Sequence, residues 1–212
     1  FMFTGSMVAV ATPMHEDGSI DFESFEKLIE FHIENKTDAI VPVGTTGESA
    51  TLNHEEHCKT INFVVSKVAN RIPVIAGTGA NSTIEAIELT KYAYDAGVDG
   101  CLSVTPYYNK PTQEGLYLHF KSIADAVPVP LIPYNVPGRT SCDMLPETVE
   151  RFLPIKNIVA IKEAIGNVDR IKKLVSICED KINILSGDDL TAMEALLNGG
   201  KGVITVTGNI AP

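Results

Sequence analysis

The chain has 212 residues, of which 44% are apolar and 21% are charged, a composition typical of a folded protein with a sizeable core and unlike a disordered or collagen-like chain. Its 17 Lys and Arg residues stand against 27 Asp and Glu residues, so the net charge of −10 argues against nucleic acid or a membrane surface as a partner. No apolar run approaches the ~20 residues that cross a bilayer, and the first residues do not resemble a signal peptide, so we expect a cytoplasmic protein.

Short apolar runs alternate with longer amphipathic stretches along the chain. The runs with the composition of β-strands are 7–11, 39–43, 73–76, 100–104, 131–134, 158–162, 183–186 and 202–206. The stretches with helical periodicity are 22–34, 53–69, 82–96, 113–126, 146–152, 168–178 and 190–198. Asn53 and Ser82 are predicted N-caps, Ser82 in a capping box with Glu85, and Gly97 lies just past the end of its helix.

The regular alternation of strand and helix predicts an α/β fold with a parallel sheet that is covered on both faces. Eight strands favour a closed (β/α)8 TIM barrel, and we expect residues 1–212 to form a single barrel domain. An open, doubly wound sheet is the alternative, but it would carry a nucleotide-binding fingerprint near its first strand, which this sequence lacks. The four Cys residues are far apart and are expected to be free thiols, neither paired as disulfides nor grouped as a zinc site.

Two glycine-rich loops follow predicted strands. GTTGE at 44–48 lacks the Gly-Lys-Ser/Thr ending of a phosphate-binding loop, and GTGAN at 77–81 lacks the third glycine of a dinucleotide fingerprint. These glycines either only permit tight turns or belong to a site, because each loop leaves the carboxyl end of a strand, where barrel enzymes build their active sites.

Lys162 ends the apolar run 158–161, so its side chain is expected to begin among apolar neighbours at the barrel mouth. Desolvation disfavours the ammonium form and leaves more free amine to attack a carbonyl group and form an imine. The alternative is a lysine that only pairs with an acidic residue at a strand end.

Three hydroxyl groups and one arginine are predicted to lie at the same rim as Lys162. Tyr134, Thr45 and Tyr108 all follow strand ends, and imine chemistry needs such groups because forming and hydrolysing a carbinolamine requires repeated proton transfer. Arg139 is a planar cation that binds carboxylates in a bidentate manner, or else forms a salt bridge within its loop.

Five motifs together closely resemble the 4-hydroxy-tetrahydrodipicolinate synthase family. They are GTTGESATL (44–52), IPVIAGTGAN (72–81), VTPYYNKPTQEGLY (104–117), YNVPGRT (134–140) and IKEA (161–164). The resemblance implies a class I aldolase-like lyase that condenses pyruvate with L-aspartate 4-semialdehyde in diaminopimelate and lysine biosynthesis, with no metal or organic cofactor.

The resemblance also implies a role for each matching residue. Lys162 matches the Schiff-base lysine, Tyr134 the general acid/base, Thr45 and Tyr108 the rest of a hydroxyl relay, and Arg139 the residue that holds the semialdehyde carboxylate. The positions that match the lining of the pyruvate pocket are Thr46, Gly187 and Ile204. In the family the tyrosine at Tyr108 is lent by a neighbouring subunit, which implies a homotetramer built as a dimer of dimers.

His54 and His57 lie three residues apart at the start of a predicted helix and share a face. From the spacing alone they are either solvated helix-end histidines or a pair that could hold a metal, although they do not form an H-E-x-x-H motif. The resemblance implies a third role, in a feedback site for lysine. The positions that match this site are Ser49, Ala50, His54, His57, Asn81, Glu85 and Tyr107.

Two other functions remain open from the sequence. One is a related pyruvate-dependent aldolase, such as an N-acetylneuraminate or 2-keto-3-deoxy sugar acid lyase, which would share Lys162 and Tyr134 but which KEA, Thr45 and Arg139 disfavour. The other is a non-catalytic lysine-binding barrel.

The length of 212 residues is short for the predicted fold. A complete (β/α)8 barrel takes about 250 residues, whereas this chain stops directly after its eighth predicted strand. The family also continues into a C-terminal helical domain, so we expect both the eighth helix and that domain to be missing and the isolated chain to be unstable or to aggregate.

Overall fold

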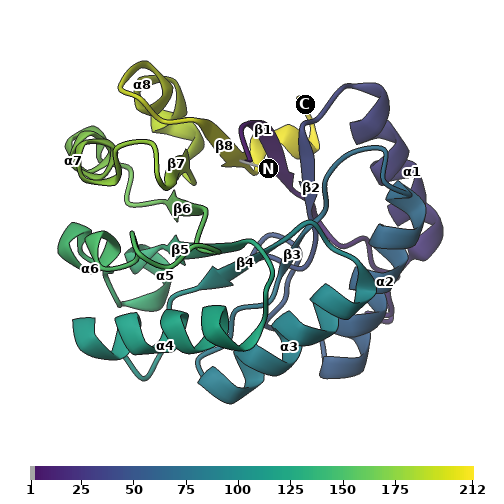
Figure 1. Ribbon diagram of the computed structural model, residues 1–212. Helices are drawn as coiled ribbons and strands as arrows, with labels where there is room; N and C mark the ends of the chain where they lie inside the picture. The colour runs from purple at the N-terminus through teal and green to yellow at the C-terminus, as the bar shows by residue number, and fades with distance from the viewer. Residues whose placement is uncertain (1–2) are drawn as a thin grey trace.

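The computed structural model describes residues 3–212, and its strands form one parallel sheet that curves into a barrel (Figure 1). The strands in this part of the chain are β1 Gly5–Ala9, β2 Ala39–Val41, β3 Ile75–Gly77, β4 Gly100–Val104, β5 Leu131–Asn135, β6 Ala160–Glu163, β7 Asn183–Ser186 and β8 Gly202–Thr205. Their order in the sheet is β2-β1-β8-β7-β6-β5-β4-β3. At the seam between β2 and β3, Ile40 N–H donates to the Pro73 carbonyl at 3.0 Å and Gly77 N–H to that of Pro42 at 2.9 Å. The predicted (β/α)8 architecture is therefore confirmed, and the open-sheet alternative is wrong.

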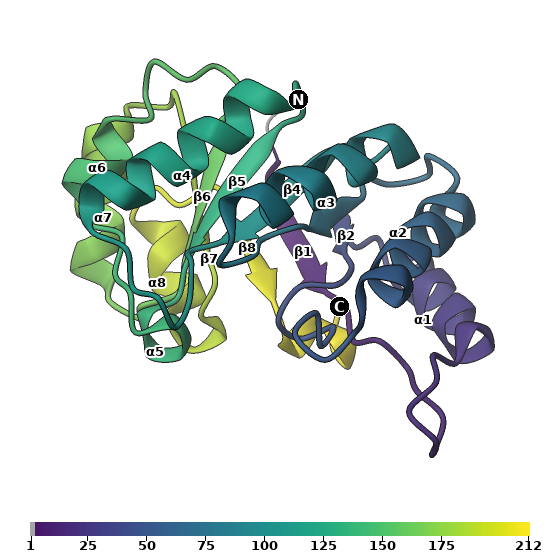
Figure 2. The same cartoon turned by 90° about the horizontal axis from the view of Figure 1, so that it is seen from below.

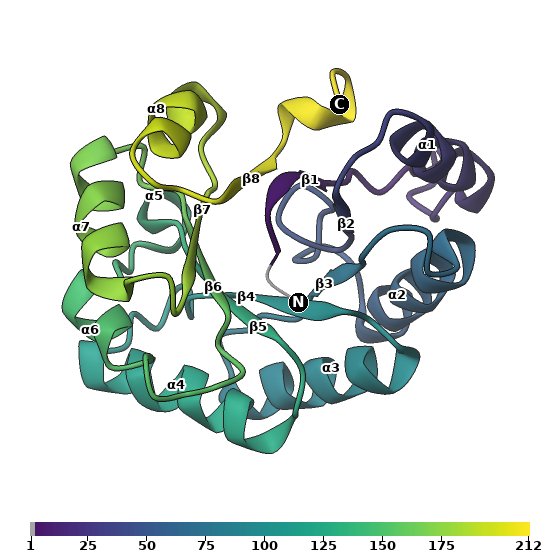
Figure 3. The same ribbon diagram turned by 45° about the horizontal axis from the view of Figure 1, so that its top comes forward.

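Helices surround this barrel on its outer side (Figure 3). They are α1 Phe22–Glu34, α2 His54–Val68, α3 Thr83–Ala96, α4 Gln113–Ala126, α5 Pro137–Thr140, α6 Pro146–Glu150, α7 Val168–Cys178 and α8 Ala192–Leu197. Two 3₁₀ turns, Asp189–Thr191 and Thr207–Asn209, follow β7 and β8. Between β1 and α1 the chain projects from the barrel as a loop in which Met14 bridges Ile20 (Figure 2).

Most predicted helix boundaries agree with the structure to within one or two residues, because caps fix them. Asn53 caps α2 in a complete capping box with Glu56, and Gly97 ends α3 with a left-handed φ of 90°. Ser82 caps α3 by accepting from Glu85 N–H at 3.5 Å, but the predicted capping box is wrong here, because the Glu85 side chain makes no return bond to the Ser82 N–H in the described structure.

Six of the eight strands differ from their predicted ranges by one or two residues at an end, and the structure explains two of these differences directly. β1 covers residues 5–9 instead of 7–11, because Ala11 N–H donates to the side-chain oxygen of Asn209 at 2.9 Å and so leaves the strand ladder. β6 begins at Ala160, two residues later than expected, since Ile158 forms only an isolated bridge with Leu131.

Two apolar layers hold the barrel together. The outer layer lies between the strands and helices and includes Val8, Ile40 and Ile161, whereas the inner layer fills the barrel and includes Met7, Leu102, Ile132, Ala160 and Ile204. Successive residues of a strand point to opposite faces, so each strand contributes to both layers. This alternation decides which side chains reach the barrel interior at its mouth.

The four cysteines, Cys58, Cys101, Cys142 and Cys178, are buried free thiols, as predicted. In the described part of the chain, no helix is both long and apolar enough to span a membrane.

His119 is a buried base between α3 and α4. Its side chain is 4% exposed, its Nδ1 shares a 2.9 Å hydrogen bond with the Thr83 hydroxyl, and its Nε2 has no partner among residues 3–212. Burial lowers the pKa of His119 from 6.5 to about 4. Between these two pH values the unfolded chain binds more protons than the folded chain, so stability falls as the pH drops from 6.5 towards 4.

We expect the neutral substitution His119→Asn to reduce this loss of stability, because the asparagine amide can replace Nδ1 beside Thr83 without taking up a proton. The residue accounts for at most about 3 kcal/mol of the pH-dependent free energy of unfolding. Urea unfolding of both proteins at pH 7.5 and pH 5 measures the difference. An identical pH dependence in the two proteins would contradict the prediction.

Candidate active site

Lys162 and Tyr134 lie side by side at the mouth of the barrel. They are register partners on β6 and β5, and both face the barrel interior. The Lys162 Nζ lies 4.3 Å from the centroid of the Tyr134 ring, and the two residues are only 5% and 6% exposed. The predicted pairing of an amine with a phenol at one rim is thus present within a single chain.

Burial of Lys162 lowers its pKa from 10.5 to about 8, with a smaller contribution from the positive charge of Arg139. The carboxylate of Asp189 acts in the opposite direction. Roughly one Lys162 side chain in ten is therefore neutral at pH 7. In the described structure Lys162 forms no salt bridge within 4.0 Å, so the simple ion-pair alternative does not apply.

Burial raises the pKa of the Tyr134 phenol, an effect that the Arg139 charge and the Thr45 hydroxyl oppose. Tyr134 thus carries its proton at neutral pH and can donate it to a developing oxyanion. Thr45 lies exposed in the turn after β2, and Thr46 is half-buried in the same turn.

Gly187 keeps space open for the lysine side chain. A Cβ atom at this position would lie 2.7 Å from Lys162 Cε and 2.8 Å from the Cβ of Ala164. Its N–H donates to the Glu163 carbonyl at 2.8 Å, which fixes the loop after β7 against β6. Ile204 is fully buried in the inner layer on β8. Both residues therefore lie in the barrel with Lys162, as expected for a small pocket around its amine.

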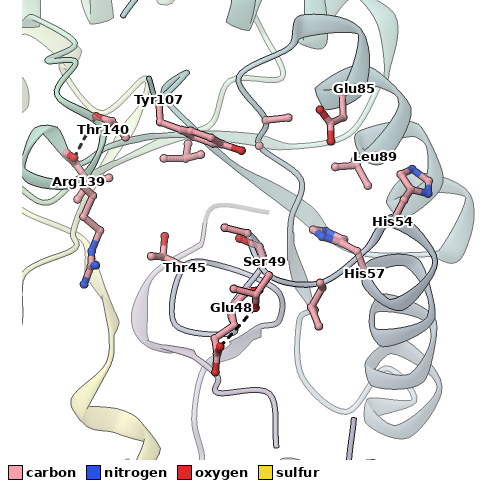
Figure 4. A pocket seen from close by; sticks show the side chains of 17 residues that line it. Thr45, Glu48, Ser49, His54, His57, Glu85, Leu89, Tyr107, Arg139 and Thr140 are labelled. Carbon is pink, nitrogen blue, oxygen red and sulfur yellow. Dashed lines mark hydrogen bonds between the residues drawn. The ribbon is translucent and has the colours of Figure 1, made fainter. Parts of the chain in front are cut away.

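Arg139 is an exposed cation on the short helix α5, which follows β5. Its side chain lines a cavity of about 400 Å³ (Figure 4). Within the described chain Arg139 makes no ion pair, so the loop salt bridge that was the alternative is absent and the guanidinium can bind an anion.

Tyr108 does not join the other predicted relay residues within one chain. Its side chain is 90% exposed, and its backbone has a left-handed φ of 69°, which is costly for a residue other than glycine. The hydroxyl relay is therefore incomplete in the isolated chain.

The same cavity contains most of the predicted lysine site. Six of the seven predicted residues line it together with Arg139 and Thr45 (Figure 4). The six are Ser49, Ala50, His54, His57, Glu85 and Tyr107. Asn81 is not in the lining, although its carbonyl accepts a 3.3 Å hydrogen bond from the side chain of Asn109.

His54 and His57 differ in their surroundings and do not converge on one point (Figure 4). The Nε2–H of His57 donates to the Gly77 carbonyl at 2.8 Å, and burial lowers the pKa of this histidine. His54 is exposed, with Nδ1 3.8 Å from the Cys58 sulfur. The reading of solvated helix-end histidines thus holds for His54 and is wrong for His57.

Two acidic residues near the strand ends, Asp189 and Glu163, were not predicted from the sequence, and of these Asp189 acts on the amine. Asp189 accepts from Val206 N–H at 3.0 Å and from Thr207 N–H at 2.8 Å, and its charge opposes the pKa shift of Lys162. Its position just after a strand end, in the sequence Gly-Asp-Asp, was the available signal. Glu163 lies directly after Lys162 and is 2% exposed.

A parallel barrel with a desolvated lysine beside a protonated tyrosine has the parts of an enzyme that forms a Schiff base with a carbonyl substrate. The model of the dihydrodipicolinate synthetase family matches residues 2–212, and the chain belongs to this family. The family expected from the motifs is thereby confirmed.

Several relatives are similar over the full chain. The 4-hydroxy-tetrahydrodipicolinate synthases of Thioalkalivibrio sulfidiphilus and Nitrosococcus oceani are 65% and 61% identical over 211 residues, which is 100% of this chain and 72% of each relative. The dihydrodipicolinate synthase of Acinetobacter baumannii complexed with pyruvate is 57% identical with a TM-score of 0.97, and the enzyme of Cyanidioschyzon merolae with lysine bound is 42% identical with a TM-score of 0.94. Each of these alignments covers 99% of this chain and 72% of the solved chain.

We expect Gly187→Ala to slow imine formation at Lys162 by about tenfold or more, because the added methyl group displaces the lysine side chain from the tyrosine. Borohydride trapping with pyruvate, followed by mass spectrometry over time, measures this rate. Gly138→Ala is the matched control, since a Cβ atom there meets nothing within 4 Å. Equal trapping rates in the two variants would contradict the assigned role of Gly187.

Proposed function

We propose that the chain condenses pyruvate with L-aspartate 4-semialdehyde to 4-hydroxy-tetrahydrodipicolinate, a step towards diaminopimelate and lysine. The observation that carries this proposal is the buried Lys162 amine, whose pKa is lowered to about 8 and which lies beside the protonated Tyr134. Arg139 supplies a cation at the same mouth for the carboxylate of a second substrate.

The first half of the reaction takes place on pyruvate. Neutral Lys162 attacks the ketone carbon, Tyr134 transfers protons to and from the carbinolamine, and water leaves as the imine forms. The protonated imine withdraws electrons, so the methyl group gives a proton to Tyr134, which is a phenolate after protonating the departing water, and an enamine results. This electron sink is part of the covalent intermediate, and the scheme therefore requires no metal or organic cofactor. Thr46, Gly187 and Ile204 are the proposed lining of the pyruvate pocket.

In the second half the enamine carbon attacks the semialdehyde carbon and forms the new C–C bond, while the aldehyde oxygen takes up a proton. The amine of the semialdehyde then attacks the imine carbon, closes the ring and releases Lys162 as the free amine. Arg139 holds the carboxylate of the semialdehyde during these steps.

We assign Thr45 and Tyr108 to the proton relay with Tyr134. The exposure of Tyr108 away from its own barrel supports a relay completed between neighbouring chains. The protein would then work as a dimer at least, and a homotetramer formed by two such dimers is the proposed assembly.

We expect borohydride trapping with pyruvate to give one adduct at Lys162, absent from Lys162→Ala. Tyr134→Phe should slow turnover by about 100-fold or more, because it removes a positioned acid/base while leaving an aromatic ring of the same shape. Intact mass and a coupled assay with both substrates are the measurements, with circular dichroism to verify folding. Wild-type turnover in either variant would refute the assigned role.

The same assay separates the alternatives. Cleavage of a sugar acid without turnover of the semialdehyde would favour a sialic-acid or keto-deoxy sugar acid lyase. Failure of pyruvate to form an adduct would leave a non-catalytic lysine-binding barrel.

We also propose that lysine binds in the other half of the 400 Å³ cavity and inhibits the enzyme. Glu85 provides an anion there for a cationic ligand, and Ser49 and Tyr107 provide hydroxyl groups. Asn81, which directly follows the lining residue Ala80, completes the proposed site.

We expect Glu85→Gln to raise the lysine concentration for half-inhibition by about tenfold, because it removes a charge-assisted bond to the ligand. Turnover without lysine should stay within about twofold of wild type, since Glu85 is on α3 away from Lys162. Glu88→Gln, on the same helix but outside the cavity, is the control. Equal lysine sensitivity in all three proteins would exclude this site.

A further inference from the structure

A buried polar cluster lies behind the two central residues of the site, on the outer face of the same strands. Asn135 and Glu163 follow Tyr134 and Lys162, and they are register partners. Because successive strand residues point to opposite faces, their side chains enter the layer between the sheet and the helices. Their exposed fractions are 0% and 2%. Neither side chain has access to the barrel interior, so their contact with the site passes through the backbone, while burial and, through space, the Glu163 charge raise the pKa of Tyr134.

The Asn135 side chain joins the two ends of the turn that carries Arg139. Its Nδ2 donates to Asp143 Oδ1 at 2.8 Å and to the two Glu163 carboxylate oxygens at 3.1 and 3.0 Å. Its Oδ1 accepts from Met144 N–H at 2.9 Å. Asn135 precedes residues 136–142, and Asp143 and Met144 follow them, so the Asn135 amide connects the two ends of the turn. We call this set of hydrogen bonds around the Asn135 amide the clasp.

Arg170 on α7 anchors the far side of this clasp. Its Nη2 donates to Asp143 Oδ2 at 2.6 Å, and its Nη1 donates to Asp143 Oδ1 at 3.2 Å and to the Met144 carbonyl at 3.1 Å. The same Nη1 lies 3.7 Å from Glu163 Oε2. Burial raises the pKa of Glu163 to about 7, which limits the net negative charge that the cluster must carry.

The turn itself is internally bonded, but the Arg139 side chain is not. Thr140 Oγ1 lies 3.2 Å from the Val136 carbonyl and 3.0 Å from the Cys142 carbonyl, either of which can accept its single hydroxyl proton, and Ser141 takes a left-handed φ of 54°. Arg139 is bonded through its backbone N–H to the Val136 carbonyl, and its guanidinium has no ion-pair partner among residues 3–212. The place of the guanidinium over the cavity therefore depends on the backbone of the turn and on what closes that turn.

We propose that Asn135, Asp143, Glu163 and Arg170 are positioning residues that hold the Arg139 turn against the ends of β5 and β6, and so set the affinity for the carboxylate-bearing second substrate. The inference rests on the proposed function for its substrate and on the contacts above for its geometry. Formation of the pyruvate imine does not require the clasp, because Lys162 and Tyr134 are fixed by the strand register and the inner layer.

The test is Asn135→Ala, which removes the closing amide. We expect the KM for aspartate semialdehyde to rise about tenfold or more, while borohydride trapping of pyruvate stays within about threefold of wild type. In an Arg139→Ala background the same substitution should change KM by less than about twofold, because the residue through which it acts is gone. Glu163→Gln keeps an acceptor for Asn135 and should preserve the wild-type KM, whereas Glu163→Ala should raise it.

Asn157→Ala is the matched control. The Asn157 amide also bonds to backbone groups: its Nδ2 donates to the carbonyls of Ala124, Val127 and Val129 at 2.9, 3.1 and 3.4 Å. However, Asn157 lies before β6, at the opposite end of the barrel from the Arg139 turn. It should lower stability without changing the KM for the semialdehyde. An unchanged KM in Asn135→Ala, or an equal rise with and without Arg139, would overturn the proposal.

A second readout does not depend on activity. Trypsin cleaves after arginine, so opening of the turn in Asn135→Ala should accelerate cleavage at Arg139. The reference is the cleavage rate of Asn157→Ala, measured under conditions in which the two variants are equally stable. If wild type showed no turnover but this acceleration occurred, the proposed function would fail and the clasp would stand. Turnover in wild type with equal cleavage in the two variants would reject the clasp alone.

Discussion

The parallel register that places Tyr134 beside Lys162 inside the barrel is the constraint on which the site depends. It takes an ammonium group out of water, and the shift of its pKa from 10.5 to about 8 corresponds to about 3 kcal/mol against the charged form. The same loss of solvation makes the amine a nucleophile near neutral pH. Gly187 leaves space for the lysine side chain, and the Asp189 charge limits the downward shift of its pKa.

The position of the Lys162 amine depends on a rigid barrel rim. Beyond the ends of the strand ladders, side-chain hydrogen bonds connect neighbouring segments of this rim. Asn209 donates to the Ala9 carbonyl and accepts from Ala11 N–H, which ties the segment after β8 to β1. Asp189 accepts from two backbone N–H groups after β8 and so ties the segment after β7 to it. Asn135 does the same for β5 and the Arg139 turn. In each case a short polar side chain satisfies backbone groups or neighbouring acids at a point where the strand ladder no longer does.

The sequence predicted the parts of this structure that follow local rules. Helix ranges such as 22–34 and 168–178 were recovered to the residue, since apolar periodicity and N-caps are encoded within a few positions. The end of β1 was misplaced, because the bond that removes Ala11 from the ladder comes from Asn209, far along the chain. For the same reason the Asn135 clasp was not predicted: its members lie in four separate segments, and none has a distinctive local pattern. The neighbouring positions of Lys162 and Tyr134 could be predicted because both residues lie at the carboxyl ends of parallel strands, which meet on one face of a barrel.

The cavity also gives the proposed inhibition a direct physical route. Thr45, on the catalytic side, and Ser49 and Ala50, on the lysine side, belong to one compact turn. Glu48 N–H donates to the Thr45 carbonyl at 3.1 Å and Ser49 N–H to that of Gly44 at 3.3 Å, while Glu48 takes a left-handed φ of 59°. Coupling between two sites needs an element that contacts both and that each ligand biases. In the proposed site, lysine bound against Ser49 would act on the same turn that carries Thr45, and the coupling would not require a longer path through the barrel.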